Sequence, residues 1–171
     1  MKMKLNKQLF LTNDTLSSDW INLSEFDILS DINNFNLLDF FNSKYYTNEF
    51  LNLKIKENKE IDFPKPLFVG CNIEISKLKV YNRNELDSFL LNYTSDVSFW
   101  GEIFHNNFIQ LYKKLKPHLD TLSQCYLLDK EEFDIESSIV TDSFLYYDYY
   151  LLFIWIDIDR MKFYTCEWAC D

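Results

Sequence analysis

Continuous and alternating apolar patterns are clearest near the C-terminal end of the chain. Residues 149–158 form an almost unbroken apolar run rich in Tyr, Leu, Ile and Trp, which predicts a buried β-strand. The polar pair Asp159-Arg160 interrupts the run, and residues 161–168 resume it, so we expect the two segments to pair as a hairpin. Neither Asp nor Arg favours a positive φ, and the pattern is therefore compatible with a loop longer than these two residues.

Two earlier segments alternate between apolar and polar positions. Residues 45–56 place Leu51, Leu53 and Ile55 on one face of an extended chain, and residues 67–75 repeat apolar side chains with a period of two. This alternation is typical of strands with one buried face. We therefore predict a strand in each segment.

Helical spacing dominates elsewhere. Residues 24–43 carry large apolar side chains at roughly three- and four-residue intervals, with Ser24 as the expected N-cap. A short helix is predicted over residues 84–93, capped by Asn82 or Asn84.

The strongest helical stripe follows, opened by Ser95 or Asp96 and ended by Pro117. A second helical piece is expected over residues 118–128. Residues 129–142 have weak periodicity, which predicts a loop with a short element near residues 135–140.

These elements predict an α+β fold in one domain spanning residues 1–171: an antiparallel sheet of about four strands with a C-terminal hairpin, and helices packed on one face. Hydrophobic residues make up 47% of the chain, which is enough for a core. The N-terminus lacks a signal-peptide pattern, and no run approaches the ~18 apolar residues of a membrane-spanning helix, so we expect a cytoplasmic protein.

The formal net charge of −10 is concentrated in residues 117–159, where ten acidic residues face one base, Lys130. Such a field repels nucleic acid and anionic lipid and attracts cationic partners, so neither a nucleic acid nor a membrane is the expected partner. Aromatic residues adjoin the acids, and Tyr is enriched at binding hot spots. A charge run can also serve only as a solvated face. The residues expected to contact a basic protein partner are Asp129, Glu131, Glu132, Asp134, Glu136, Asp142, Tyr146, Tyr147, Asp148 and Tyr149.

Catalytic motifs are missing from the sequence. It has no GxSxG, P-loop or HExxH pattern, and two glycines cannot build a phosphate cradle. We therefore expect no enzyme activity, no cofactor and no metal, with the four cysteines packed as free thiols. His105 lies beside apolar neighbours, and His118 follows Pro117 at a predicted helix end. One alternative is an enzyme in which Asp157 and Asp159, at a strand end, hold a divalent metal.

The small size, acidity, aromatic content and C-terminal sequence LFIWIDIDRMKFYTCEWACD resemble those of bacterial immunity proteins, which neutralise contact-delivered or polymorphic toxins. The resemblance implies a basic toxin domain as partner, commonly a nuclease, whose active site the acidic residues would occlude. A rival interpretation of the same charge is an acidic mimic of nucleic acid that inhibits a host or phage-defence DNA-binding protein.

Overall fold

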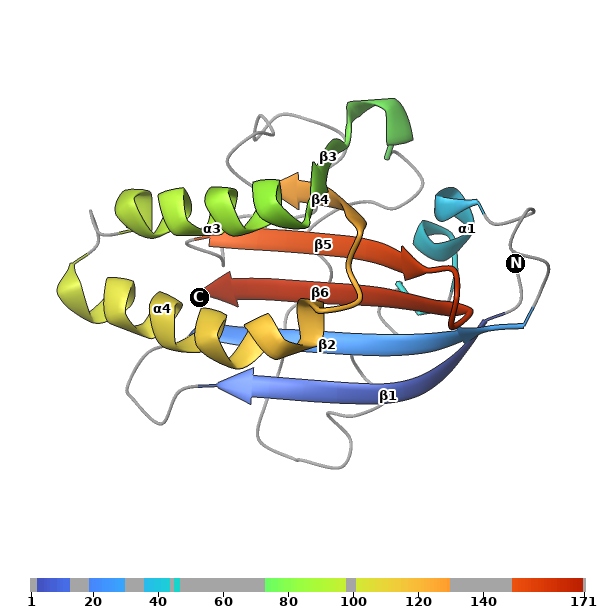
Figure 1. The fold of residues 1–171 in the computed structure, drawn as a ribbon, viewed down its shortest axis with the longest axis horizontal. Coiled ribbons are helices and arrows are strands. Elements are labelled where there is room, and N and C mark those ends of the chain that lie inside the picture. Colours follow the sequence, from blue (N-terminus) through green and yellow to red (C-terminus); the bar gives the residue numbers. More distant parts are fainter. Residues whose placement is uncertain are drawn as a thin grey trace.

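Six antiparallel strands form one sheet in the residues that the structure describes (Figure 1). The structure is a computed structural model, and it describes residues 3–12, 19–29, 36–43, 45–46, 73–97, 101–129 and 149–170. The strand order is β1-β2-β6-β5-β4-β3. The strands are β1 (Met3–Thr12), β2 (Asp19–Ile28), β3 (Lys79–Asn82), β4 (Gln124–Asp129), β5 (Tyr149–Asp157) and β6 (Lys162–Cys170).

Helices of two kinds accompany this sheet. The α-helices are α1 (Leu37–Phe41), α3 (Arg83–Val97) and α4 (Glu102–Leu115), and the 3-10 helices are η3 (Ile75–Lys77) and η5 (Lys116–Leu119). The predicted α+β class is confirmed, and the expected count of about four strands is corrected to six in the described part of the chain.

The predicted C-terminal hairpin lies in the middle of the sheet. β5 and β6 pair with each other, and their outer neighbours are β4 and β2. Nearly every residue of both strands is buried, because each face of the hairpin is covered. The loop comprises residues 158–161, longer than the two interrupting residues, and Met161 adopts a φ of 53°.

The helix predicted over residues 24–43 is wrong at its start and, in the described part, confirmed only over Leu37–Phe41. Its first residues belong to β2, which pairs with β1 on one side and β6 on the other. Helical order is limited to α1, where the Asn36 Oδ1 accepts a hydrogen bond from the Leu38 amide at 3.0 Å. Asn22 and Ser24 are buried polar residues of β2, and they interrupt its apolar pattern. Pairing with a strand on each side stabilises β2 as a strand in spite of the local helical spacing.

Most of the two other predicted strands lies outside the described residues. Residues 45–46, at the start of the first, form a turn. Ile73 and Glu74, near the end of the second, have no regular structure, and Ile75 begins η3, so no strand reaches these positions.

Helices α3 and α4 differ from the prediction in where the first ends and the second begins. Asn82 caps α3 as predicted: its Oδ1 accepts from the Glu85 amide at 3.0 Å, and the Glu85 carboxylate accepts from the Asn82 amide at 2.8 Å. α3 then continues through Val97, so neither Ser95 nor Asp96 caps the next helix. α4 starts after Gly101, whose φ of 112° is in the region that glycine adopts readily.

The helix predicted over residues 118–128 ends after one turn. η5 stops at Leu119, and β4 begins at Gln124. β4 fills the place between β3 and β5, with Cys125 and Leu127 on one face and Leu128 on the other. The three-residue spacing of Leu119, Leu122 and Cys125 is also typical of a helix. This segment forms a strand because β3 and β5 pair with it on both sides.

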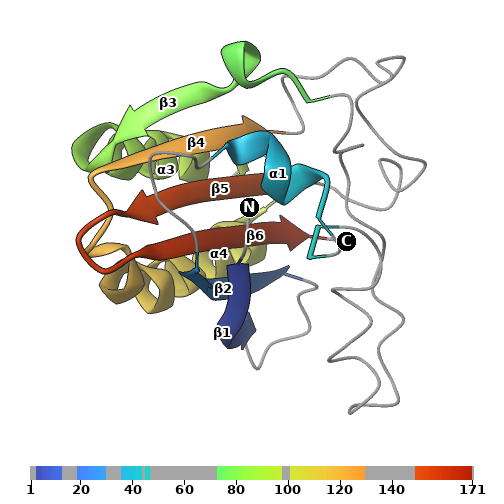
Figure 2. The ribbon, with the colours of Figure 1, turned by 90° about the vertical axis from the view of Figure 1, so that its right-hand side faces the viewer.

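Each face of the sheet carries its own hydrophobic core, so the prediction that helices cover only one face is wrong. α3 and α4 cover one face, and α1 lies on the other (Figure 2). On the α4 face, Phe108 stacks on Trp168 with ring centroids 3.9 Å apart. On the α1 face, Phe40 packs on Phe163 with centroids 4.9 Å apart. Two-sided burial explains why β5 lacks polar-apolar alternation.

The packing of α4 on β6 leads to a stability prediction. Phe108 is fully buried, and replacing it by alanine (Phe108→Ala) should lower the free energy of unfolding by about 3–5 kcal/mol, because it removes the stacked partner of Trp168 and leaves a cavity. Ile103→Ala on the same helix is the control: Ile103 is 70% exposed, and its loss should change stability by about 0.5 kcal/mol or less. Urea unfolding measures both. Equal losses would contradict this orientation of α4.

Candidate functional site

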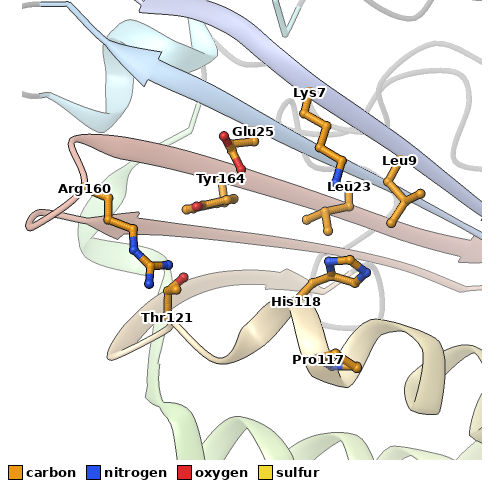
Figure 3. Close-up of a pocket in the computed structure, with 9 residues that line it drawn as sticks. All are labelled: Lys7, Leu9, Leu23, Glu25, Pro117, His118, Thr121, Arg160 and Tyr164. Atoms are coloured by element: carbon orange, nitrogen blue, oxygen red, sulfur yellow. The ribbon is translucent and has the colours of Figure 1, made fainter.

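A pocket of about 190 Å³ lies between the β1–β2–β6 part of the sheet and η5 (Figure 3). Side chains of three strands form one wall, and η5, the turn after it and the β5–β6 loop form the rest. Its lining residues are Lys7, Leu9, Leu23, Glu25, Pro117, His118, Thr121, Arg160 and Tyr164. Pro117 has no amide proton and so cannot continue the hydrogen bonding of α4, which passes directly into η5 at Lys116. The chain therefore turns there and places His118 in the pocket wall.

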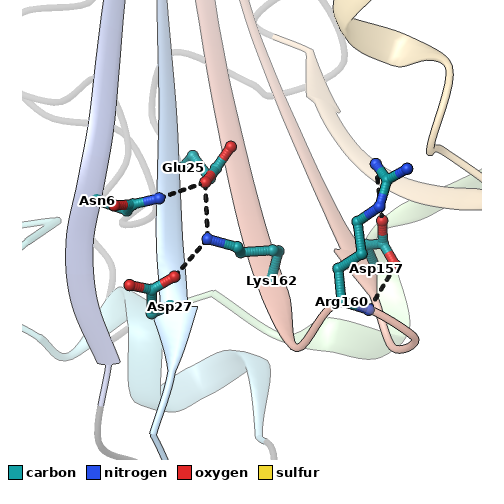
Figure 4. Close-up of polar contacts among 6 residues, drawn as sticks. All are labelled: Asn6, Glu25, Asp27, Asp157, Arg160 and Lys162. Atoms are coloured by element: carbon teal, nitrogen blue, oxygen red, sulfur yellow. Dashed lines mark hydrogen bonds and ion pairs between the residues drawn. The ribbon is translucent and has the colours of Figure 1, made fainter.

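The carboxylate of Glu25 is held by two donors on neighbouring strands (Figure 4). Its Oε1 accepts from the Lys162 Nζ at 2.9 Å and from the Asn6 Nδ2 at 2.6 Å. The same ammonium also pairs with the Asp27 carboxylate. Burial raises the pKa of Glu25, but the hydrogen bonds from Lys162 and Asn6 outweigh it, and the pKa is lowered overall. Hydrogen bonds to Asp27 and Glu25 raise the pKa of Lys162, so the Glu25 carboxylate and the Lys162 ammonium are both charged at neutral pH.

The β5–β6 loop positions Arg160 beside the pocket. The Asp157 Oδ1 accepts a hydrogen bond from the Arg160 amide at 3.0 Å, which closes the loop. The Arg160 guanidinium lies 3.7 Å from the other Asp157 oxygen, and its side chain is 64% exposed. The Asp157 carboxylate thus holds the loop, and Asp159 is exposed beyond the strand. Within the described ranges, no group of three or more His, Cys, Asp or Glu side chains could hold a metal ion.

Tyr164 forms the back of the pocket. Its ring stacks on Trp155 with centroids 4.9 Å apart and planes only 9° from parallel. Burial is the largest cause that raises the pKa of the phenol, and the nearby charges of Glu25 and Asp157 raise it further, while Lys162 and the Thr121 hydroxyl lower it. The phenol is therefore a neutral hydrogen-bonding group, and its ring is a rigid apolar surface.

On the opposite face, a row of polar side chains crosses four strands. The Gln8 amide donates to the Asn22 Oδ1 at 2.9 Å, and the Asn22 amide donates to the Glu167 carboxylate at 3.0 Å. The Tyr150 hydroxyl donates to the other Glu167 oxygen at 2.6 Å. Burial raises the pKa of Glu167, and the bonds from Tyr150 and Asn22 partly offset it. This row links β1, β2, β6 and β5, and its polar groups satisfy one another.

The ten residues expected to contact a partner fall into two groups. Asp129 and Tyr149 are described, and both are buried, at 5% and 1% exposure, so neither lies on the surface. The Tyr149 hydroxyl donates to the Asp19 carboxylate at 2.6 Å. Burial is also the main cause that raises the pKa of this phenol. The other eight lie outside the described residues: Glu131, Glu132, Asp134, Glu136, Asp142, Tyr146, Tyr147 and Asp148.

Sequence reasoning did not identify the pocket. Lys7, Glu25 and Arg160 come from parts of the chain that the sheet pairing brings together, and no local motif connects them. Asp120, two residues after His118, does not line the pocket, whereas the fold places the distant Glu25 in the same pocket as His118. The one local signal is Arg160 in the loop of a predicted hairpin.

Comparisons with known proteins add no relative: no family model, no curated protein and no solved structure matches this chain. No helix of the described residues is long and apolar enough to cross a membrane.

The Glu25–Lys162 contact leads to a prediction about ionisation. In Lys162→Met, the pKa of Glu25 should rise above its value in the unchanged protein, because burial and the Asp27 charge then act without the ammonium. A pH titration followed by carboxyl ¹³C NMR measures the shift. Lys113→Met, which removes an exposed charge on α4, is the matched control and should leave the Glu25 pKa unchanged.

Stability should follow the same ionisation. The folded pKa of Glu25 is lowered, so the contact stabilises the fold above the ordinary glutamate value of 4.5 and loses its effect as pH falls through the folded pKa. At pH 7 Lys162→Met should cost about 1 kcal/mol, since the pair is only partly buried, and the cost should shrink in acid. A cost that does not change between pH 7 and pH 3 would contradict this assignment.

Proposed function

We propose that this protein is an immunity-type inhibitor that binds a basic toxin domain through residues 130–148, here called the acidic insertion. Six acidic residues and one lysine lie in the insertion, giving −5 of the chain's net −10. This concentration of charge, placed between two directly paired strands, is the observation that carries the proposal. Opposite charge speeds association and favours one partner over others.

The insertion is longer than the strand pairing requires. β4 and β5 are antiparallel neighbours, with Asp129 paired to Leu151, and hairpins of this kind close with two to five residues. The chain uses nineteen. Long connections in compact domains commonly carry function. The pairing of β4 with β5 does not need the additional residues, and their presence supports a role in binding.

Both ends of the insertion are attached to the sheet. Asp129, the residue just before the insertion, is buried. Tyr149, the residue just after it, is also buried, and its hydroxyl donates a hydrogen bond to Asp19. We therefore reassign these two residues from partner contacts to anchors. A connection held at both ends loses less conformational freedom on binding than a free tail of the same length.

The proposed mechanism is occlusion of a cleft lined by Lys and Arg in a nuclease-type toxin. Glu131, Glu132, Asp134 and Glu136 would take the positions of substrate phosphates, with Asp142 and Asp148 extending the charged patch. Tyr146 and Tyr147 would fill apolar hollows between the basic side chains. An acidic mimic of nucleic acid would use the same charge but would bind many DNA-binding proteins.

Growth rescue tests the function directly. The open reading frame next to the gene of this protein is expressed inducibly in bacterial cells, with and without this protein, and the density of the culture is followed. We expect the neighbour's product to arrest growth and this protein to restore it. Arrest without rescue, or a neighbour that is harmless, contradicts the assignment, and binding to several unrelated DNA-binding proteins would favour the mimic.

The insertion should dominate the association kinetics. The double reversal Glu131→Lys/Glu132→Lys should slow association with the toxin domain by at least about tenfold at low salt, because the steering charge is reduced by four units. Stopped-flow mixing at two salt concentrations measures this effect.

Asp120→Lys/Asp159→Lys is the matched control for that reversal. It changes the net charge by the same amount at two exposed positions, just before β4 begins and just after β5 ends, which is the opposite end of both strands from the insertion. The control should have the smaller effect. If both double variants slow association equally, net charge and not the insertion guides binding.

A further inference from the structure

We propose that the pocket between β1, β2, β6 and η5 binds a small organic anion, in which a phosphate or carboxylate group is attached to an apolar body of about one ring. Arg160 lies beyond the end of β5, whereas the acidic insertion joins the beginning of that strand. The inference does not depend on the proposed toxin partner.

The charge of the pocket favours an anion even though the whole chain is acidic. Lys7 and Arg160 are the charged bases that line it, and Glu25 is the one acidic side chain among the described lining residues. Lys162 and Asn6 already satisfy one Glu25 oxygen, and the Lys162 ammonium is shared between Glu25 and Asp27. Lys7 and Arg160 together outnumber Glu25, so the lining residues by themselves carry a net positive charge.

The cations are available to a ligand. In the ranges that the structure describes, the side chains of Lys7 and His118 take part in no hydrogen bond or ion pair. The Arg160 guanidinium makes one ion pair at 3.7 Å, a contact long enough to be exchanged for a closer anion. Guanidinium and ammonium groups are the side chains that most often bind phosphate and carboxylate in proteins.

The rest of the wall is apolar and rigid. Leu9 and Leu23 project from neighbouring strands, and Pro117 lines the η5 side (Figure 3). The Tyr164 ring is fixed by its stacking on Trp155. Cavities of about 150 Å³ hold a benzene ring in other proteins. A volume of about 190 Å³ thus fits one ring together with its charged group.

Calorimetric titration of the full chain tests the proposal with three probes of similar shape. Phenyl phosphate and benzoate carry the two anionic groups, and benzyl alcohol carries none. We expect the better anion to bind at least about tenfold more tightly than benzyl alcohol, and the order of the two anions identifies the group for which the pocket is built. Equal binding of all three, or no binding of either anion, overturns the proposal.

Two lysines on the same strand provide the matched variants. Lys7→Gln should weaken binding of the better anion about fivefold, the equivalent of about 1 kcal/mol for an exposed charge pair. Lys4→Gln removes an equal charge from an exposed position that does not line the pocket, and should leave the affinity unchanged. Both side chains are exposed, so neither change threatens folding. If both variants weaken anion binding equally, the effect comes from the net charge of the protein and not from the pocket, and the proposed site is wrong.

Discussion

Pairing of β5 with β6 in the middle of the sheet is the constraint on which the rest of the structure depends. The two strands pair along their whole length, from Tyr149 with Cys170 to Asp157 with Lys162, and both faces of the hairpin are buried. The α4 face receives Trp155 and Trp168, and the α1 face receives Phe163. Because both cores attach to the same two strands, helices on either side are held in position by one element.

The two ends of this hairpin carry the two candidate sites. At the loop end, Asp157 closes the turn, Arg160 lies over the pocket, and Lys162 joins β6 to Glu25 on β2. At the other end, Tyr149 is bonded to Asp19 at the start of β2, which holds the point where the acidic insertion enters the sheet. One hairpin thus carries the pocket at its loop end and, at its other end, the point where the acidic insertion joins β5.

The sequence predicted those parts of the fold in which local pattern and tertiary pairing agree. The C-terminal hairpin and the Asn82 cap of α3 are of this kind, because a continuous apolar run and a side-chain cap need no distant partner to be recognised. The second half of β2 and most of β4 fall in segments that were predicted as helical. Their apolar residues fit a three- or four-residue spacing, and only pairing on both sides makes them strands.

Of the two sites, the sequence indicated only the acidic insertion, which is contiguous and strongly charged. The pocket joins Lys7 to Glu25 and Arg160, and such a set becomes visible only when the register of β1, β2 and β6 is known. The prediction that Asp129 and Tyr149 lie on the surface was wrong as well. The acidic or aromatic character of a residue does not reveal whether its position in a strand is buried.

Replacing the acidic insertion tests the central claim, that the sheet is a self-sufficient support for a separate binding segment. Exchanging residues 131–148 for Ser-Asn-Gly preserves the register in which Asp129 pairs with Leu151 and closes β4 and β5 with a two-residue turn. The measurement is growth protection by this shortened protein, with its cooperative unfolding recorded in parallel. The account predicts a folded protein that no longer protects. Full protection by the shortened protein, or loss of the cooperative fold, would contradict it.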